Sequence, residues 1–142
     1  MKKVLLDISV VLDLVLNRAP WAADASAIWD AHVNGQIQVF LAAFSLPTIF
    51  YIVRRQADLS AAREAVRVCL DTLEIVPIDH AALEAAWAMP GSDFEDNLQI
   101  ASAVQAGIDI IITRDPRGFS ASPIAVLSPS DLRSQMSGTP PP

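Results

Sequence analysis

The feature that most constrains the fold is an alternation of short β-branched runs with longer stretches of helical periodicity. The apolar runs, which we interpret as strands, cover residues 3–6, 39–42, 74–78, 110–113 and 125–127. The stretches between them, which we interpret as helices, cover residues 9–17, 21–34, 45–56, 60–73, 79–89 and 93–106. Strands that alternate with helices form parallel sheets with both faces covered. The sequence therefore predicts an α/β fold, a three-layer α/β/α sandwich around a central parallel sheet of four to five strands.

Some positions within this pattern can be predicted more closely. The segment 109–113 is apolar without alternation, as a strand buried on both faces must be, so we expect it in mid-sheet. Gly35 and Gly107 are expected at left-handed helix ends, and Ser45 and Ser60 are expected to cap the helices that they begin. A last short helix is predicted after Ser128, where a capping-box spacing coincides with a proline at the first helical position.

One domain of residues 1–135 is predicted, with a disordered tail of residues 136–142 that has nothing to bury. No apolar run approaches the roughly 20 residues that cross a bilayer, and Asp7 interrupts the stretch that a signal sequence would keep apolar. Cys69 is the only cysteine, which excludes an intramolecular disulfide, and we expect it in the core. We therefore expect a soluble, cytoplasmic protein that does not contact membranes.

The formal net charge of −6 argues against broad, non-specific adhesion to nucleic acid. The count is made on the metal-free chain, however, and a bound cation would neutralise acids that gather in one pocket. A nucleic-acid substrate is thus disfavoured by net charge without being excluded.

Three carboxylates are predicted to converge. Asp7 ends the first strand, Asp115 follows the fourth, and Asp96 begins the helix that leads into the fourth strand. Ligands of open parallel sheets bind beyond the carboxyl ends of the strands, and a helix that returns to a parallel strand begins at that same edge. Grouped carboxylates with no cysteine or histidine favour Mg²⁺ or Mn²⁺, which can activate water for phosphodiester hydrolysis.

Each of these acids has a structural role as an alternative to the catalytic one. Asp93 and Glu95 resemble a helix start, because Ser92 and Glu95 have capping-box spacing. Asp7 could serve only as a cap, and Asp115, before a proline, only as a turn residue.

Most other polar and aromatic residues are expected to have structural or surface roles. Asp13 is expected on a solvated helix face and Asp79 at an N-cap, whereas His32 and His80 lack a partner at ligand spacing. The three tryptophans are expected to pack in the core; they are Trp21, Trp29 and Trp87. Arg114 and Arg117, beside the acidic rim, are the candidates for contact with RNA phosphates.

Two parts of the chain resemble a known family. Segment 4–14, VLLDISVVLDL, resembles the opening strand and helix of PIN domains, the VapC-like toxin ribonucleases among them. Segments 93–103, DFEDNLQIASA, and 111–115, IITRD, resemble the second acidic helix and the Thr-Arg-Asn segment of that family. With the order of strands and helices, the resemblance runs from about residue 1 to residue 131.

The resemblance implies roles for particular residues. Asp7 would be the first metal-binding acid, supported by Ser9, and Asp96 the third, with Asp93 or Glu95 assisting. Thr113, from the Thr-Arg-Asn segment, and Thr48 would support the site.

The sequence also departs from the family pattern. Thr48 stands where many relatives have a glutamate, and Gly118 stands where an acid often precedes a phenylalanine. Asp115 replaces the usual asparagine and could substitute for that missing acid.

The function implied is a Mg²⁺- or Mn²⁺-dependent endoribonuclease of the PIN type, with catalytic Asp7, Asp96 and Asp115, and the toxin of a toxin–antitoxin pair is one setting for it. The alternative is a catalytically impaired PIN-like domain that binds RNA or a protein partner, which Thr48 and Gly118 favour. The expected partners are RNA, a small antitoxin over the acidic rim and a second copy of the chain. Residues 46–53 and 61–73 could form the interface with the second copy, and ordinary packing of these helices in the core is the alternative.

Overall fold

Five parallel strands form one sheet in the order β3-β2-β1-β4-β5 in the computed structural model, which describes residues 1–138. The strands are β1 (Lys3–Leu6), β2 (Gln38–Ala42), β3 (Glu74–Val76), β4 (Ile110–Ile112) and β5 (Ala125–Leu127). The helices are α1 (Ile8–Val15), α2 (Ala22–Val33), α3 (Ser45–Gln56), α4 (Leu59–Thr72), α5 (His80–Ala88), α6 (Phe94–Gln105) and α7 (Pro129–Met136), with a 3₁₀ turn η1 (Pro116–Phe119). The predicted α/β class and the parallel sheet are confirmed.

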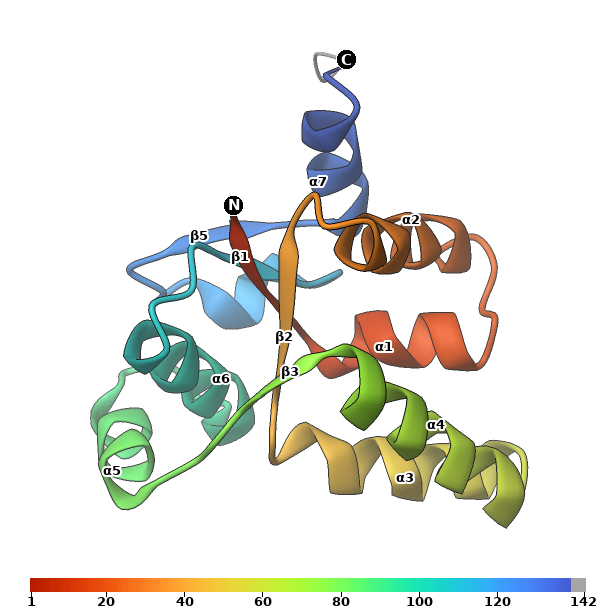
Figure 1. Cartoon of the computed structure of the whole chain (residues 1–142). Coiled ribbons are helices and arrows are strands. Elements are labelled where there is room, and N and C mark those ends of the chain that lie inside the picture. Colours follow the sequence, from red (N-terminus) through yellow and green to blue (C-terminus); the bar gives the residue numbers. More distant parts are fainter. Residues whose placement is uncertain (139–142) are drawn as a thin grey trace.

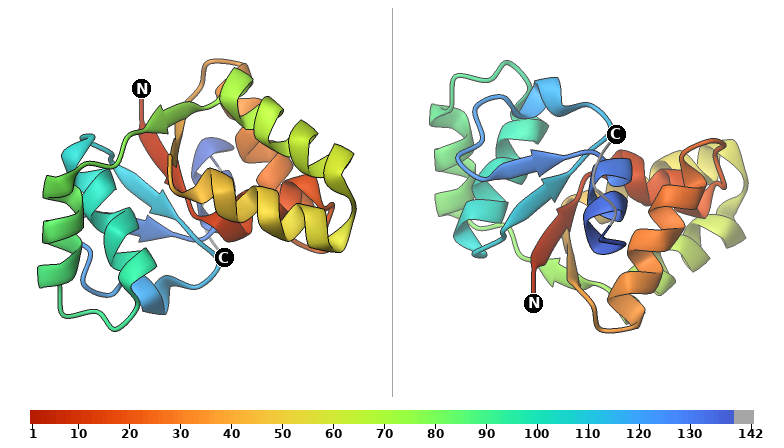
Figure 2. Two further views of the ribbon diagram at one scale, coloured as in Figure 1. Left: turned by 90° about the horizontal axis from the view of Figure 1, so that it is seen from below. Right: turned by 90° about the horizontal axis from the view of Figure 1, so that it is seen from above.

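Helices cover both faces of the sheet (Figures 1 and 2). Helices α1 to α4 and α7 pack on one face, around a core to which Val4 and Leu6 of β1 contribute. Helix α6 and η1 pack on the other face, where Leu5 of β1 contacts a second core, and α5 lies outside α6. Alternate residues of one buried strand therefore reach opposite cores, which is why segment 109–113 carries no polar alternation.

The helix ends match the prediction in part. Gly35 and Gly107 adopt φ of 77° and 69°, and the Ser128 hydroxyl accepts from the Asp131 amide at 3.1 Å. The predicted caps Ser45 and Ser60 are wrong. Ser45 is buried within the first turn of α3, and Asp58 caps α4 in place of Ser60 because its carboxylate accepts from the Ala61 amide at 2.7 Å.

The three tryptophans do not share one environment. Trp29 packs against the larger core, as predicted. Trp21 and Trp87 are exposed, so the prediction of core packing is wrong for both. On α5 it is Ala82 and Ala86 that face α6, and this leaves the indole of Trp87 on the outer side of the helix.

The remaining expectations concern the chain ends and the single thiol. Met136 is the last residue of α7 and packs against the core, and residues 139–142 of the predicted tail lie outside the described part. Cys69 is buried as expected, and its burial raises the pKa of the thiol to about 11. Within residues 1–138, no helix has the length and apolar character to cross a membrane.

Candidate active site

Asp7 lies where β1 ends and caps α1, and four donors hold its carboxylate. Oδ1 accepts from the Ile8 amide at 2.8 Å and from Gln99 Nε2 at 2.7 Å. Oδ2 accepts from Ser9 Oγ at 3.1 Å and from Thr113 Oγ1 at 2.8 Å. A carboxylate offers about four lone-pair positions. The orientation of Asp7 is therefore fixed from both sides.

The sheet explains why Thr113 can reach Asp7. Strands β1 and β4 are parallel neighbours with Leu6 opposite Ile112, and the Asp7 amide donates to the Ile112 carbonyl at 2.9 Å. Residues that follow paired parallel strands must emerge at one edge, as the sequence argument assumed. Asp7 and Thr113 are thus brought together by register alone.

Gln99 is a site residue that sequence reasoning missed. Its side chain is buried on α6, and its amide nitrogen bonds Asp7 while Oε1 has no hydrogen-bond partner in the described part of the chain. The available signal was a glutamine between Leu98 and Ile100, in a stretch otherwise suited to the core. A buried amide of this kind needs a polar partner, and Asp7 is that partner.

Asp96 lies one turn before Gln99 on α6, and its situation is the opposite of that of Asp7. Across residues 1–138, no hydrogen-bond donor or cation contacts its carboxylate. Burial raises its pKa to about 6, and the negative charges of Asp93, Asp7, Asp115 and Glu95 add to that rise in this order. Asp96 is therefore near enough to these acids for their charges to add to the effect of burial on its carboxylate.

Gly118 of η1 accommodates the Asp96 carboxylate. A Cβ atom at residue 118 would collide with Asp96 Oδ2, so the space of a side chain there is already occupied. Asp96 can thus take its present position only because residue 118 has no side chain.

Asp93 and Glu95 lie on either side of the α6 start. Asp93 is the N-cap, accepting from the Asp96 amide at 3.1 Å, so the capping alternative is correct for Asp93, and Ser92 is not the cap. Glu95 is exposed in the first turn. Both acids also contribute to the raised pKa of Asp96.

Asp115 is exposed at the rim, where it begins η1. Its Oδ1 accepts from the Arg117 amide at 3.4 Å and pairs with Arg117 Nε at 3.1 Å, and its own amide donates to Thr113 Oγ1 at 3.1 Å. The hydrogen bond from Arg117 lowers the pKa of Asp115. Asp115 thus adds negative charge near Asp96 while its carboxylate is engaged by a cation.

Asp13 is buried and forms an ion pair with the partly exposed Arg114, which corrects the prediction of a solvated Asp13. Asp13 is 1% exposed instead of solvated; its Oδ2 pairs with Arg114 Nε at 2.7 Å, and Arg18 Nη1 lies 3.8 Å from Oδ1. Burial outweighs these arginines and raises the pKa of Asp13. The Arg114 guanidinium also lies over Trp21, 3.9 Å from the ring centroid. Arg114 therefore braces the loop after β4 and is not free for the predicted phosphate contact.

Thr48 gives no support to the predicted site. It is half-buried in α3, and its hydroxyl makes no hydrogen bond within the described part of the chain. Ser45, one turn earlier, is fully buried, and its hydroxyl likewise has no partner among residues 1–138. Helix α3 thus supplies no charge to the rim.

The chain was compared with protein families and with solved structures. The family model described as PIN domain matches residues 3–117. The chain belongs to the PIN domain family. None of the curated proteins matches it.

Solved structures with similar folds include FitAcB, one toxin and one toxin–antitoxin complex. FitAcB from Neisseria gonorrhoeae is 19% identical with a TM-score of 0.70, over 89% of this chain and 98% of that one. VapC20 from Mycobacterium tuberculosis, described as a Sarcin-Ricin loop cleaving toxin, is 17% identical with a TM-score of 0.68, over 83% and 94%. A toxin-antitoxin complex from Klebsiella pneumoniae is 19% identical with a TM-score of 0.66, over 89% and 97%. At these identities the likeness concerns the fold.

The PIN family typically uses metal ions. Residues 1–138 contain no group of three or more acidic, histidine or cysteine side chains that could hold an ion by themselves. Mg²⁺, however, usually takes one or two carboxylates and completes its shell with waters and phosphate oxygens. The Asp96 carboxylate accepts no hydrogen bond within residues 1–138, and the Asp7 carboxylate is held in a fixed orientation. These two carboxylates meet that smaller requirement. Asp96 and Asp7 fit the ion; the larger predicted ligand set is not assembled.

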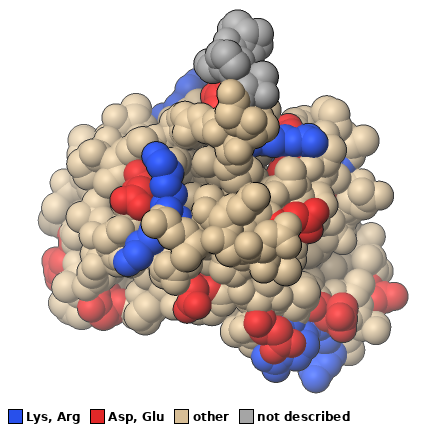
Figure 3. Space-filling view, turned by 45° about the horizontal axis from the view of Figure 1, so that its top comes forward, with Lys and Arg blue, Asp and Glu red and all other residues tan. Residues whose placement is uncertain are grey.

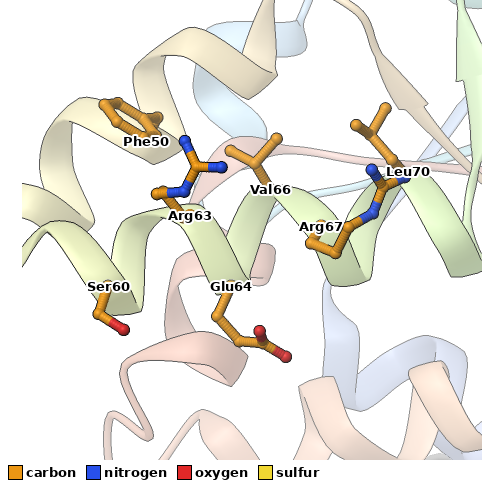
Figure 4. A pocket seen from close by; sticks show the side chains of 7 residues that line it. All are labelled: Phe50, Ser60, Arg63, Glu64, Val66, Arg67 and Leu70. Carbon is orange, nitrogen blue, oxygen red and sulfur yellow. The ribbon is translucent and has the colours of Figure 1, made fainter.

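A groove of this PIN domain lies away from these acids. It has a volume of about 450 Å³ and is lined by Phe50, Ser60, Arg63, Glu64, Val66, Arg67 and Leu70 of α3 and α4 (Figure 4). On the face in Figure 3, Lys and Arg form no continuous area. No predicted site residue lines the groove.

Proposed function

We propose that this PIN domain is a Mg²⁺- or Mn²⁺-dependent endoribonuclease that hydrolyses RNA phosphodiester bonds. The proposal rests on one observation: the Asp96 carboxylate has no donor within residues 1–138, while burial, followed by the charges of the neighbouring acids, raises its pKa to about 6. A side chain that carries such repulsion binds a cation favourably, because the cation removes the repulsion. Family membership provides the reaction class.

The roles of the residues follow from their contacts. Asp7 would be the oriented ligand: a bound ion would replace one of the four donors on its carboxylate, and the remaining donors would keep the carboxylate in place. Asp96 would be the second ligand, and Asp93 and Glu95 would keep the rim negative around it. The ion, when bound, lowers the pKa of a coordinated water and stabilises the charge that develops on the phosphate.

Arg117 is the remaining candidate for contact with the RNA backbone. Its side chain is 90% exposed, and Asp115, its one ion-pair partner among residues 1–138, is exposed as well. Exposed ion pairs contribute little free energy, so exchange of Asp115 for a phosphate would cost little. Asp115 would then be released toward the acidic rim, where its predicted role as a third catalytic acid would apply.

We also propose a small antitoxin as protein partner, since several structural neighbours are toxin–antitoxin complexes. The expected homodimer is a weaker part of the proposal. Most apolar side chains of α3 and α4 pack into the larger core, and Tyr51, Leu59 and Leu70 are the large ones left exposed there. An RNA substrate implies action in the cytoplasm.

A second candidate function is a PIN domain that has lost catalysis and only binds RNA or a protein. Three observations favour it: Thr48 supplies no charge, Gly118 supplies no acid, and Asp115 is paired with Arg117. The retained Asp7 and Asp96 oppose it.

Cleavage of a pool of RNAs with Mg²⁺ or Mn²⁺ separates the two candidates. We expect cleavage by the parent protein and none by Asp7→Asn or Asp96→Asn, whereas Asp30→Asn, an exposed acid of α2, serves as matched control. No cleavage by the parent with RNA still bound would favour the binding function. Equal cleavage by all four proteins would indicate a contaminating nuclease and refute the proposed mechanism.

A further inference from the structure

A small cavity lies where the start of α2, the loop after β4 and the start of α7 meet. It has a volume of about 170 Å³ and is lined by Trp21, Asp24, Arg114, Ser128, Pro129 and Ser130. A cavity of about 150 Å³ is large enough to hold a benzene ring, so this cavity can accept a planar ring. None of the acids proposed as metal ligands lines it.

Trp21 forms an aromatic wall of this cavity, and Arg114 holds the indole in place. The indole is 41% exposed, and the Arg114 guanidinium lies over it, 3.9 Å from the ring centroid. The buried Asp13 holds that guanidinium with both of its oxygens, Oδ2 to Nε at 2.7 Å and Oδ1 to Nη2 at 3.2 Å. The stacked pair is thus already oriented, and binding of a ring to it requires little ordering of side chains.

The charges at the cavity favour a neutral ring over a phosphate. Arg114 already has its buried carboxylate partner, and Arg133 of α7 pairs with Asp24 of α2 at 3.0 Å. A phosphate would have to displace one of these carboxylates, whereas a neutral ring can stack on the indole with both ion pairs intact. The Ser128 and Ser130 hydroxyls, 3.2 Å apart, add groups that donate and accept hydrogen bonds. A nucleobase has both a π face and such polar edges.

The cavity lies on the same edge of the sheet as Asp7. The register of β1, β4 and β5 places Asp7, Thr113 and Ser128 in one row, because each follows a strand that ends opposite its neighbour. Neighbouring strands are about 4.8 Å apart, so Ser128 lies roughly 10 Å from Asp7 along this edge. Arg114, next to Thr113, extends to the α1 side of the row. A nucleotide that adjoins a phosphate at Asp7 can therefore extend its base into the cavity.

We propose that Trp21 and Arg114 form a base-stacking subsite, which takes one nucleobase of a single-stranded RNA beside the phosphate that is cleaved. The indole provides the stacking face, and the Ser128 and Ser130 hydroxyls meet the edge of the base. The subsite rests on the proposed function in one respect, namely that RNA is the ligand of the rim. It makes Trp21 a residue for substrate binding and not for the chemical step.

Binding of two short single-stranded oligomers tests the subsite. One consists of adenosine nucleotides, and the other consists of abasic ribose phosphates of the same length and charge. Titrations with EDTA and with Ca²⁺ should show at least about tenfold tighter binding of the first oligomer, since a base stacked on an aromatic side chain contributes at least that factor. The indole N–H resonance of Trp21 should shift with the first oligomer only. Equal affinity for the two oligomers, or no binding of either, would overturn the subsite.

Variants locate the stacked base. Trp21→Ala should remove most of the preference for the oligomer with bases, and Trp21→Phe should keep most of it. Ser130→Leu, a change at an exposed residue that fills the cavity and leaves Trp21 intact, should weaken the same oligomer by about tenfold even if Trp21→Ala fails to fold. Trp87→Ala, which removes an exposed tryptophan of α5, is the matched control and should bind as the parent does. A preference that survives in Trp21→Ala or in Ser130→Leu, or that is lost in Trp87→Ala, would overturn the subsite.

Cleavage kinetics separate this proposal from the nuclease function. Trp21→Ala should raise KM by about tenfold with kcat little changed, which is the pattern of lost substrate binding. A loss of kcat with KM unchanged would assign Trp21 to the geometry of the loop and overturn the subsite, with the nuclease function intact. A parent protein that cleaves no RNA but still prefers the oligomer with bases through Trp21 would refute the nuclease and support the subsite.

Discussion

Asp7 and Asp96 belong to one rim but are held in opposite ways. Asp7 accepts four hydrogen bonds, from the chain that follows it, from β4 and from α6. Asp96 accepts none from residues 1–138 and lies among like charges. Hydrogen bonds to a carboxylate stabilise its charged form, and burial among acids does the reverse.

This difference indicates a division of roles between the two acids. A saturated carboxylate is rigid and provides geometry, whereas an unsaturated one keeps free lone pairs and provides affinity for a cation. A site needs both, because an ion binds tightly only where ligands are oriented and still available. The following predictions test this division, from the largest expected effect to the smallest.

Substitution of Asp7 should have the largest effect. Asp7→Asn directs an amide N–H at one of the groups that now donate to Oδ1 or Oδ2, so cleavage should fall by about a thousandfold or more and unfolding should require roughly 1–3 kcal/mol less. Initial rates on a labelled RNA and thermal unfolding measure the two effects. A variant as stable as Asp30→Asn would contradict the fixed role of Asp7.

Gly118→Ala should displace Asp96 without removing its charge. The added methyl group collides with Asp96 Oδ2, so either the carboxylate or η1 must move. Cleavage should fall by about 10- to 100-fold, with a stability loss of roughly 1–3 kcal/mol. Ser120→Ala, an exposed change that follows η1, is the matched control. Unchanged rates in Gly118→Ala would mean that the position of Asp96 is not critical.

Gln99→Met should loosen Asp7 while keeping the core filled. It removes the donor to Oδ1, and it also removes the unpartnered Oε1, so stability should change by less than about 1 kcal/mol. Cleavage should fall by about tenfold, with Mn²⁺ affinity, measured by electron paramagnetic resonance, reduced in parallel. A rate loss with unchanged Mn²⁺ affinity would argue that Gln99 does not orient the ligand.

Asp96→Asn should produce a small, pH-dependent gain in stability of the metal-free protein. The native pKa of about 6 exceeds the ordinary value of 3.8, so the native state holds the proton longer, and stability falls as pH rises from about 4 to 6. Above pH 6 the variant should be more stable by about 1 kcal/mol, discounted for solvent exposure, or about 3 °C in Tm. The difference should vanish near pH 4, and Mg²⁺ should reverse it by stabilising only the parent. A Tm difference between parent and variant that is the same at pH 4 and at pH 7 would contradict the repulsion.

The sequence was sufficient for the parts that repetition and topology determine. Parallel strands end at one edge, so the ends of β1 and β4, with Asp7 and Asp115, were expected at the same rim, whereas the support of the site by Thr113 was expected only from the family resemblance. The pair Asp13–Arg114 did not follow, because a polar residue on an amphipathic helix has the same local pattern whether it faces solvent or a loop 100 residues away. Gln99 was missed for the same reason: its partner is distant in sequence.

Local sequence patterns also could not predict which aromatic residues are exposed. Trp87 lies among alanines, and composition cannot tell whether the alanines or the indole face α6. The packing distance between α5 and α6 decides, since small side chains let the two helices approach and leave the large one outside.

The space above Gly118 has an evolutionary consequence. Because Asp96 already fills it, an acid at residue 118 and the present rotamer of Asp96 exclude one another. A lineage that regained the acid would first have to alter residue 96 or the backbone of η1, so the order of the mutations would matter. This is epistasis with a steric origin, and it makes the departure at residue 118 hard to reverse by a single substitution.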